Sequence, residues 1–155
     1  MPKTLTVELV TPEKVALTQS ADFVALPAFE GEMGVMPGHE AFLVQLAAGE
    51  VRVRRGGETS SFAVSGGFAE ILKDKVSVFA ETAEMASKID AERARQDMEA
   101  AKLESRTAGA DPLTLAQAAA HLAQAQARVR VAQLRGRRGV KPTAPESNGG
   151  SDALR

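Results

Sequence analysis

The chain has 155 residues, of which 44% are hydrophobic and 25% are charged, and these proportions are ordinary for a soluble globular protein. Its length allows one domain with an appendage or two small units. Cysteine is absent, which excludes disulfides and thiolate metal sites and favours a cytosolic setting. Tryptophan and tyrosine are absent too, so a core has to be built from aliphatic residues and six phenylalanines.

The net charge of −1 conceals an uneven distribution of charge along the chain. Residues 1–88 carry 12 acidic and 8 basic side chains, and residues 89–111 carry 6 and 4. Residues 112–155 carry 2 acidic and 7 basic side chains, a net charge of +5. The two ends of the protein therefore present different electrostatic fields to a partner.

The sequence does not indicate a membrane-spanning or secreted protein. No stretch reaches the roughly 18 apolar residues of a membrane span, and the first residues lack the apolar core of a signal peptide. We therefore expect the protein to stay in the cytoplasm and to reach a membrane only through a partner.

Residues 1–87 show the alternation of apolar and polar side chains that is typical of β-strands. Glycine-rich turn signals interrupt this pattern at short intervals. A period of two places one face of each strand in a core and the other in solvent, as in antiparallel sheets. The pattern predicts a β-sandwich or flattened barrel of about eight to ten strands. The positions expected to be buried include Leu5, Val7, Leu9, Val51, Val53, Val76 and Val78.

Residues 88–138 are predicted to form an antiparallel hairpin of two helices, over about 90–106 and 112–136. Asp90 is a good N-cap for the first helix, and Asp111, followed by proline, is a good N-cap for the second. Because only some five residues join the helices, they have to run antiparallel.

The apolar face of each predicted helix consists mostly of alanine. Alanine buries little area, and each missing methylene removes about 0.8 kcal/mol of transfer free energy. Alanine is also the best helix former, so either helix remains plausible when it is detached from the other. Two interpretations stay open, a hairpin that opens without melting and a rigid alanine coil. The predicted contact positions are Ala91, Ala94, Met98 and Ala101 in the first helix, and Leu115, Ala118, Leu122, Ala125, Val129 and Ala132 in the second.

The C-terminal end combines a basic helix end with a tail, residues 139–155, that is expected to be disordered because glycine, proline, serine and asparagine dominate it. The basic side chains could bind nucleic acid phosphates or an acidic protein surface, or could simply be solvated. Aromatic residues for base stacking are absent there, and the arginines are distributed around the helix. The residues in question are Arg128, Arg130, Arg135, Arg137, Arg138 and Lys141.

Candidate catalytic residues are few. His121 is most simply a surface residue of the second helix. His39 follows a segment that contains Glu30 and Glu32, and this combination could bind a metal or perform acid–base chemistry. No second histidine or cysteine is near in sequence, and a solvated loop explains the charges equally well. We predict no catalytic residue and no metal site.

Three segments resemble conserved blocks of a known family, the epsilon subunit of rotary, proton-translocating ATP synthases of the bacterial type. Residues 26–39, which include Glu-Gly-Glu-Met-Gly-Val-Met-Pro-Gly-His, are similar to the signature of that family. Residues 65–81 resemble its second block, and residues 89–94 resemble its Ile-Asp-x-x-Arg-Ala motif at the head of the first helix. The resemblance covers about residues 3–136.

The resemblance implies a ten-stranded β-sandwich followed by a two-helix hairpin, in a non-catalytic subunit of the central stalk. The sandwich would dock on the gamma subunit and touch the c-ring, coupling the two during ATP synthesis. The complex would lie at the cytoplasmic face of the bacterial inner membrane. On this resemblance, the segment with Glu30, Glu32 and His39 contacts the ring and the gamma subunit.

The resemblance also implies that the hairpin can regulate the enzyme. In many family members an extended hairpin rises along gamma into the catalytic head and blocks ATP hydrolysis. Here the basic side chains without compensating anions suit an acidic segment of the catalytic beta subunits. This inhibitory basic helix would comprise Arg128, Arg130, Arg135, Arg137 and Arg138.

In some relatives the Ile-Asp-x-x-Arg-Ala motif belongs to a site where ATP stabilises the folded-down hairpin. Ile89, Asp90, Arg93 and Ala94 match that motif. The alternative interpretation, which we favour, is that Asp90 caps the helix and Arg93 pairs with Asp97. We therefore expect no cofactor, with ATP as a possible regulatory ligand only. Two other functions are alternatives: a nucleic-acid-associated protein that uses the basic helix and, ranked last, a small β-sandwich enzyme.

Overall fold

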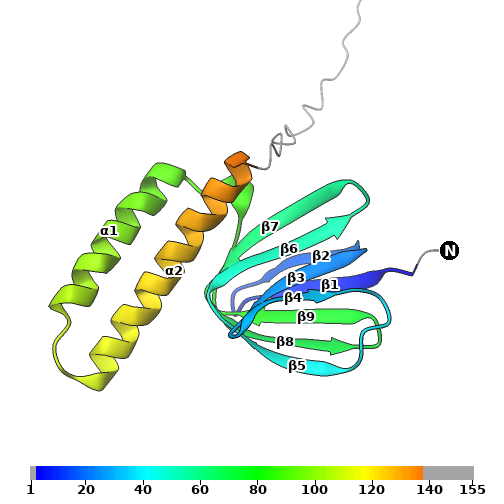
Figure 1. Ribbon diagram of the computed structural model, residues 1–155, viewed down its shortest axis with the longest axis horizontal. Helices are drawn as coiled ribbons and strands as arrows, with labels where there is room; N and C mark the ends of the chain where they lie inside the picture. Colours follow the sequence, from blue (N-terminus) through cyan, green and yellow to red (C-terminus); the bar gives the residue numbers. More distant parts are fainter. Residues whose placement is uncertain (1–2, 138–155) are drawn as a thin grey trace, which may run out of the picture.

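The computed structural model describes residues 3–137, and Figure 1 shows a strand-rich N-terminal part followed by two long helices. Ten strands form one sheet, in the order β10-β7-β6-β3-β5-β8-β9-β1-β2, with β4 paired to β3. The predicted fold class, a ten-stranded β-sandwich followed by a helical hairpin, is confirmed. The strands are β1 (Leu5–Val10), β2 (Val15–Ala21), β3 (Phe23–Ala28), β4 (Gly31–Val35), β5 (Phe42–Leu46), β6 (Gly49–Arg55), β7 (Glu58–Val64), β8 (Gly67–Leu72), β9 (Lys75–Ala80) and β10 (Ala83–Met85).

The sheet bends between β3 and β5, which are joined at a single register pair, Ala28 with Leu46. Its two halves therefore face each other and enclose one hydrophobic core. The apolar positions of the alternating pattern point into this core, and all seven that the sequence identified are at most 1% exposed. Phe62, Leu26 and Ile71 are among the largest fully buried side chains.

The turn that leads into β8 depends on two consecutive glycines. Gly66 and Gly67 have φ angles of +106° and +129°, which L-amino acids with a side chain rarely adopt. A Cβ atom at Gly67 would lie 2.0 Å from the carbonyl oxygen of Phe79 on the neighbouring strand β9. Glycine is therefore required at this position both for the backbone angle and for space.

Helix α1 (Ala91–Thr107) and helix α2 (Pro112–Arg137) follow a short 3₁₀ helix, η1 (Ala86–Lys88). Figure 1 shows α2 lying between α1 and the sandwich, and α2 contacts β6, β7 and η1. Both expected helices are present within a residue of the predicted bounds. None of the described helices is long and apolar enough to cross a membrane. The predicted disordered tail, residues 139–155, and Arg138 lie outside the described residues.

Helix α2 has two buried faces, whereas the sequence predicted one. The predicted face packs on α1, and its alanine and valine positions are buried. A second face, which includes Ala127 and Val131, is also buried and lies toward the sandwich. The prediction for Leu115 was wrong, because this side chain is 45% exposed. It lies in the first turn of α2.

We expect Gly67→Ala to lower the free energy of unfolding by about 2 kcal/mol or more, because it adds a clash to a strained backbone angle. Urea titrations of both proteins measure this change. Gly57→Ala is the matched control, since its added Cβ meets nothing within 4 Å and its φ is not positive. Equal losses in the two variants would contradict the proposed cause.

Candidate functional site

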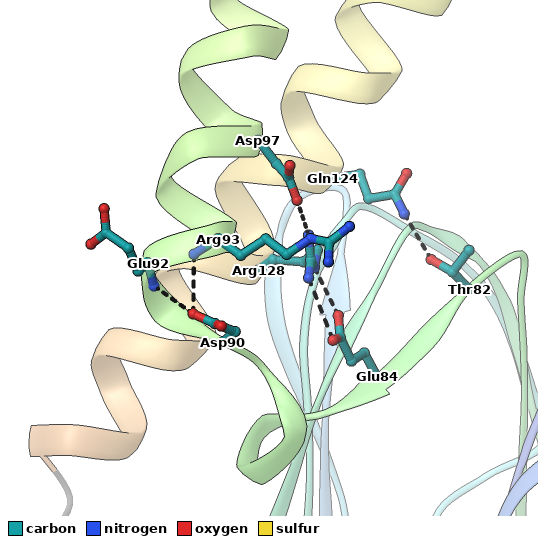
Figure 2. A network of polar contacts seen from close by, with 8 residues as sticks. All are labelled: Thr82, Glu84, Asp90, Glu92, Arg93, Asp97, Gln124 and Arg128. Atoms are coloured by element: carbon teal, nitrogen blue, oxygen red, sulfur yellow. Dashed lines mark hydrogen bonds and ion pairs between the residues drawn. The ribbon is translucent and has the colours of Figure 1, made fainter.

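Arg128 of α2 binds carboxylates from two other elements (Figure 2). Its Nε donates to Oε2 of Glu84 on β10 at 2.7 Å, and its Nη1 donates to Oδ2 of Asp97 on α1 at 2.9 Å. Nη2 lies 3.4 Å from the other carboxylate oxygen of Glu84. One guanidinium thus joins the sandwich, the first helix and the second helix. We refer to Arg128, Glu84 and Asp97 as the Arg128 network.

The Arg128 network is partly shielded from solvent, since the side chain of Arg128 is only 22% exposed. The hydrogen bond that Arg128 donates to Glu84, reinforced by the one to Asp97, raises the pKa of Arg128 above its ordinary value, although desolvation acts in the opposite direction. The guanidinium therefore keeps its charge throughout the physiological pH range. Partial burial also makes these bonds stronger than fully exposed ion pairs, which contribute little.

Two further side chains of α2 bind the same part of the sandwich. Gln124 donates from Nε2 to Oγ1 of Thr82 at 3.0 Å, as Figure 2 shows. Arg135 donates from Nη1 to the carbonyl oxygen of Ala86 at 2.6 Å. Polar side chains along more than three turns of α2 therefore converge on residues 82–86.

These contacts correct the prediction that the arginines of α2 have no compensating anion. Arg128 is paired twice and Arg135 is bound to a backbone carbonyl, so both face the protein and not solvent. Arg130 is exposed and has no ion pair within residues 3–137. Arg137 ends the helix, and Arg138 is outside the described residues. The sequence could not show this, because Glu84 lies 44 positions from Arg128.

The motif at the head of α1 has a structural role. Oδ1 of Asp90 accepts hydrogen bonds from the backbone N–H groups of Glu92 and Arg93, at 3.0 and 3.1 Å, as an N-cap does. Ile89 and Ala94 are buried in a small cluster between the hairpin and the sandwich. The predicted pairing of Arg93 with Asp97 was wrong, since Asp97 binds Arg128.

Glu30, Glu32 and His39 are not brought together in one loop. Glu30 lies in the turn between β3 and β4, and Glu32 lies within β4, where it pairs with Arg52 of β6. His39 lies beyond the other end of β4, and its Nδ1 donates to the carbonyl oxygen of Glu40 at 2.7 Å. Strand β4 therefore separates the turn with Glu30 from His39. Within residues 3–137 no group of three or more possible metal ligands occurs.

The outer face of the sandwich carries an apolar patch that the sequence reading missed. Phe68 of β8 and Phe79 of β9 are register partners, 49% and 37% exposed, with stacked rings whose centroids lie 5.0 Å apart. Leu43 and Leu72 are exposed nearby on β5 and β8. The signal was present, because both phenylalanines occupy positions that the alternation assigns to the solvent face.

Comparisons with known proteins decide the family. The model of the family described as "ATP synthase, Delta/Epsilon chain, beta-sandwich domain" matches residues 4–86, which is more than half of the chain. The chain belongs to this family. As an epsilon-family member it is a non-catalytic subunit of the central stalk of ATP synthase, which is a membrane-associated complex.

Two ATP synthase epsilon chains are similar to this chain over most of their own length. The ATP synthase epsilon chain of Nitratidesulfovibrio vulgaris strain DP4 is 49% identical over 96 residues, 62% of this chain and 72% of the relative. That of Desulforamulus reducens is 40% identical over 111 residues, 72% and 84% of the two chains.

Solved structures of ATP synthases contain chains of the same fold. A chain in the Euglena gracilis mitochondrial ATP synthase, solved as OSCP/F1/c-ring in rotational state 1, aligns with a TM-score of 0.73 at 26% identity, over 86% of this chain and 83% of that chain. A chain of the Tetrahymena thermophila central stalk and c-ring has a TM-score of 0.56 at 18% identity, over 85% and 96% of the two chains, and shows the shared fold alone.

For this epsilon-family chain, we expect Asp90→Ala to lower the free energy of unfolding by about 1 kcal/mol, because two backbone donors lose their cap. Asp90→Asn is the matched variant, since asparagine caps as well as aspartate but carries no charge. Urea titration should therefore give Asp90→Asn a midpoint close to that of the unchanged protein. A loss as large as that of Asp90→Ala would indicate that the charge and not the cap is required.

Proposed function

We propose that this chain couples the gamma subunit to the c-ring during proton-driven ATP synthesis, at the cytoplasmic face of a bacterial inner membrane. The family membership and the likeness to a chain of an F1/c-ring complex support this function. The observation that carries it is the exposed Phe68–Phe79 stack on the outer face of β8 and β9. We propose no cofactor for this role, with ATP at Ile89–Ala94 as a regulatory ligand only.

The outer face of β8 and β9 is the proposed docking surface for gamma. Contiguous exposed apolar side chains are unusual on a monomer and are typical of protein interfaces, in which aromatic residues are enriched. The patch lies on the side of the sheet opposite to the core, so a partner could cover it without any change in the fold. The phenylalanine rings are already stacked on each other, which lowers the entropy lost on binding.

The acidic turn between β3 and β4 is proposed to face the polar loops of the c-ring. Glu30 and Phe29 are both exposed at this turn, and Phe29 is 67% exposed. His39, at the other end of β4, is proposed to lie toward gamma. The separation of these regions suits a subunit that has to contact two partners at once.

The exposed cations of α2 do not support a nucleic-acid function. Such binding needs several cations on one accessible face. Among the α2 arginines whose side chains are described, Arg128 and Arg135 are bound to the protein itself, which leaves Arg130 exposed.

We expect Phe79→Ser to weaken the binding of gamma roughly tenfold or more, as the loss of a buried aromatic anchor does. Isothermal titration or pull-down with purified gamma measures the effect. Leu103→Ser removes an exposed apolar side chain from α1, away from the patch, and serves as the control; Leu103 is 62% exposed and Phe79 is 37% exposed. Unchanged binding by Phe79→Ser, in a protein that unfolds normally, would rule out this docking surface.

A second prediction concerns inhibition by the hairpin, the family role implied for the basic helix. ATP hydrolysis by the catalytic head is expected to be slower with the full chain than with a chain cut after Ser87. The sandwich has its own closed core, so the shorter chain is expected to fold and to bind gamma. Equal hydrolysis rates would show that this hairpin does not inhibit.

A further inference from the structure

A single carboxylate lies in the middle of the exposed apolar patch on β5, β8 and β9. Glu70 is exposed on the outer face of β8, with Phe68 and Leu72 two positions away on the same side of the strand. Its register partner on β5 is Leu43, and its register partner on β9 is Ser77. Phe68, Leu72 and Leu43 are 49%, 46% and 65% exposed. Glu70 is therefore bordered by apolar side chains on three sides and by a neutral serine on the fourth.

Glu70 has no cation of its own within residues 3–137, where neither an ion pair nor a side-chain hydrogen bond involves it. Among the residues of β5, β8 and β9 the one cation is Lys75, which lies opposite Leu72. Its Nζ binds Oε2 of Glu8 on β1 at 3.3 Å. Glu8 and Glu70 are the register partners of Ser77 on its two sides. The outer face thus carries two carboxylates and one lysine, and the lysine is already bound to Glu8.

A partner that covers the Phe68–Phe79 stack also has to cover Glu70. Two positions along a strand span about 7 Å, which is far less than the width of a standard protein interface. The carboxylate then leaves water, and burial of an unpaired charge costs more than burial of one apolar side chain contributes. A surface that places a cation opposite Glu70 removes this penalty and gains a charge-assisted hydrogen bond. The patch therefore discriminates against uncharged and acidic surfaces.

We propose that Glu70 selects the partner of this patch, and that the partner places a lysine or arginine side chain against it. The proposal rests on the proposed function and names the chemistry that the docking surface of gamma has to present, an apolar surface with one cation in its middle. Arginine suits the position better than lysine. Its planar guanidinium donates two parallel hydrogen bonds to a carboxylate and packs on the faces of aromatic rings such as those of Phe68 and Phe79.

Isothermal titration of the full chain with purified gamma tests the proposal through the direction of the change in affinity. Glu70→Gln keeps the shape of the side chain and removes its charge. With a gamma cation opposite, we expect Glu70→Gln to weaken binding roughly tenfold or more, and Glu70→Lys roughly a hundredfold or more because like charges then meet. Without that cation, Glu70→Gln relieves a desolvation cost and binds more tightly. Tighter or unchanged binding by Glu70→Gln would overturn the proposal.

Glu58→Gln is the matched control. Glu58 is exposed on β7, outside the patch, and its replacement changes the net charge of the chain by the same amount. Its affinity for gamma is expected to equal that of the unchanged chain, and urea titration is expected to give both variants the midpoint of the unchanged chain. Equal losses of affinity in Glu58→Gln and Glu70→Gln would show that net charge and not position is responsible, which contradicts the proposal.

Rescue from the side of gamma identifies the cation. Each exposed lysine and arginine of gamma is replaced in turn by glutamate and titrated against Glu70→Lys. One replacement is expected to restore binding to Glu70→Lys while it weakens binding to the unchanged chain, and the absence of any such replacement would count against the ion pair.

The proposed function is tested separately by the unchanged chain and by Phe79→Ser. If the unchanged chain does not bind gamma, or Phe79→Ser binds it equally well, the docking surface itself is wrong and the role of Glu70 is wrong with it. Weaker binding by Phe79→Ser without weaker binding by Glu70→Gln would leave the docking surface in place and overturn only the role of Glu70.

Discussion

Helix α2 has to pack against two neighbours at once, and most of the architecture depends on this constraint. On one side it meets α1, and on the other it meets the sandwich. A helix between two layers at close range can carry only small side chains on both faces, which accounts for its alanine content. The area buried on either side is then modest, and polar side chains such as Arg128, Gln124 and Arg135 provide the specific attachment.

Periodicity in the sequence was sufficient to predict the core and the helices because both depend on local spacing. The alternating residues from Leu5 to Val78 are buried as predicted, and Asp90 caps its helix as predicted. The partners of Arg128 could not be predicted in this way. Glu84 and Asp97 are brought to it by the fold, across 44 and 31 positions of sequence. A pairing of Arg93 with Asp97, four residues apart on one helix, was the simpler prediction from the sequence. It was nevertheless wrong, because Asp97 binds Arg128.

The segment around Glu30 and His39 shows a different limit of sequence reasoning. Glycines and prolines made it resemble one long loop, and the charged residues within it could then be read as a cluster. The structure places strand β4 in the middle, so that Glu30 and His39 lie beyond opposite ends of this strand. A continuous motif in sequence thus supplies two separate surfaces.

The position of β1 has a consequence for how the sandwich folds while the chain is being synthesised. This first strand pairs with β2 on one side and, in parallel, with β9 on the other, joining Thr6 to Lys75 and Val10 to Phe79. Its second neighbour leaves the ribosome only after nearly the whole sandwich has been translated. Until then the edge of β1 stays unpaired, and closure of the sheet has to wait for a contact between distant parts of the chain. The hairpin therefore emerges after the sandwich, when the surface on which it docks has just been completed.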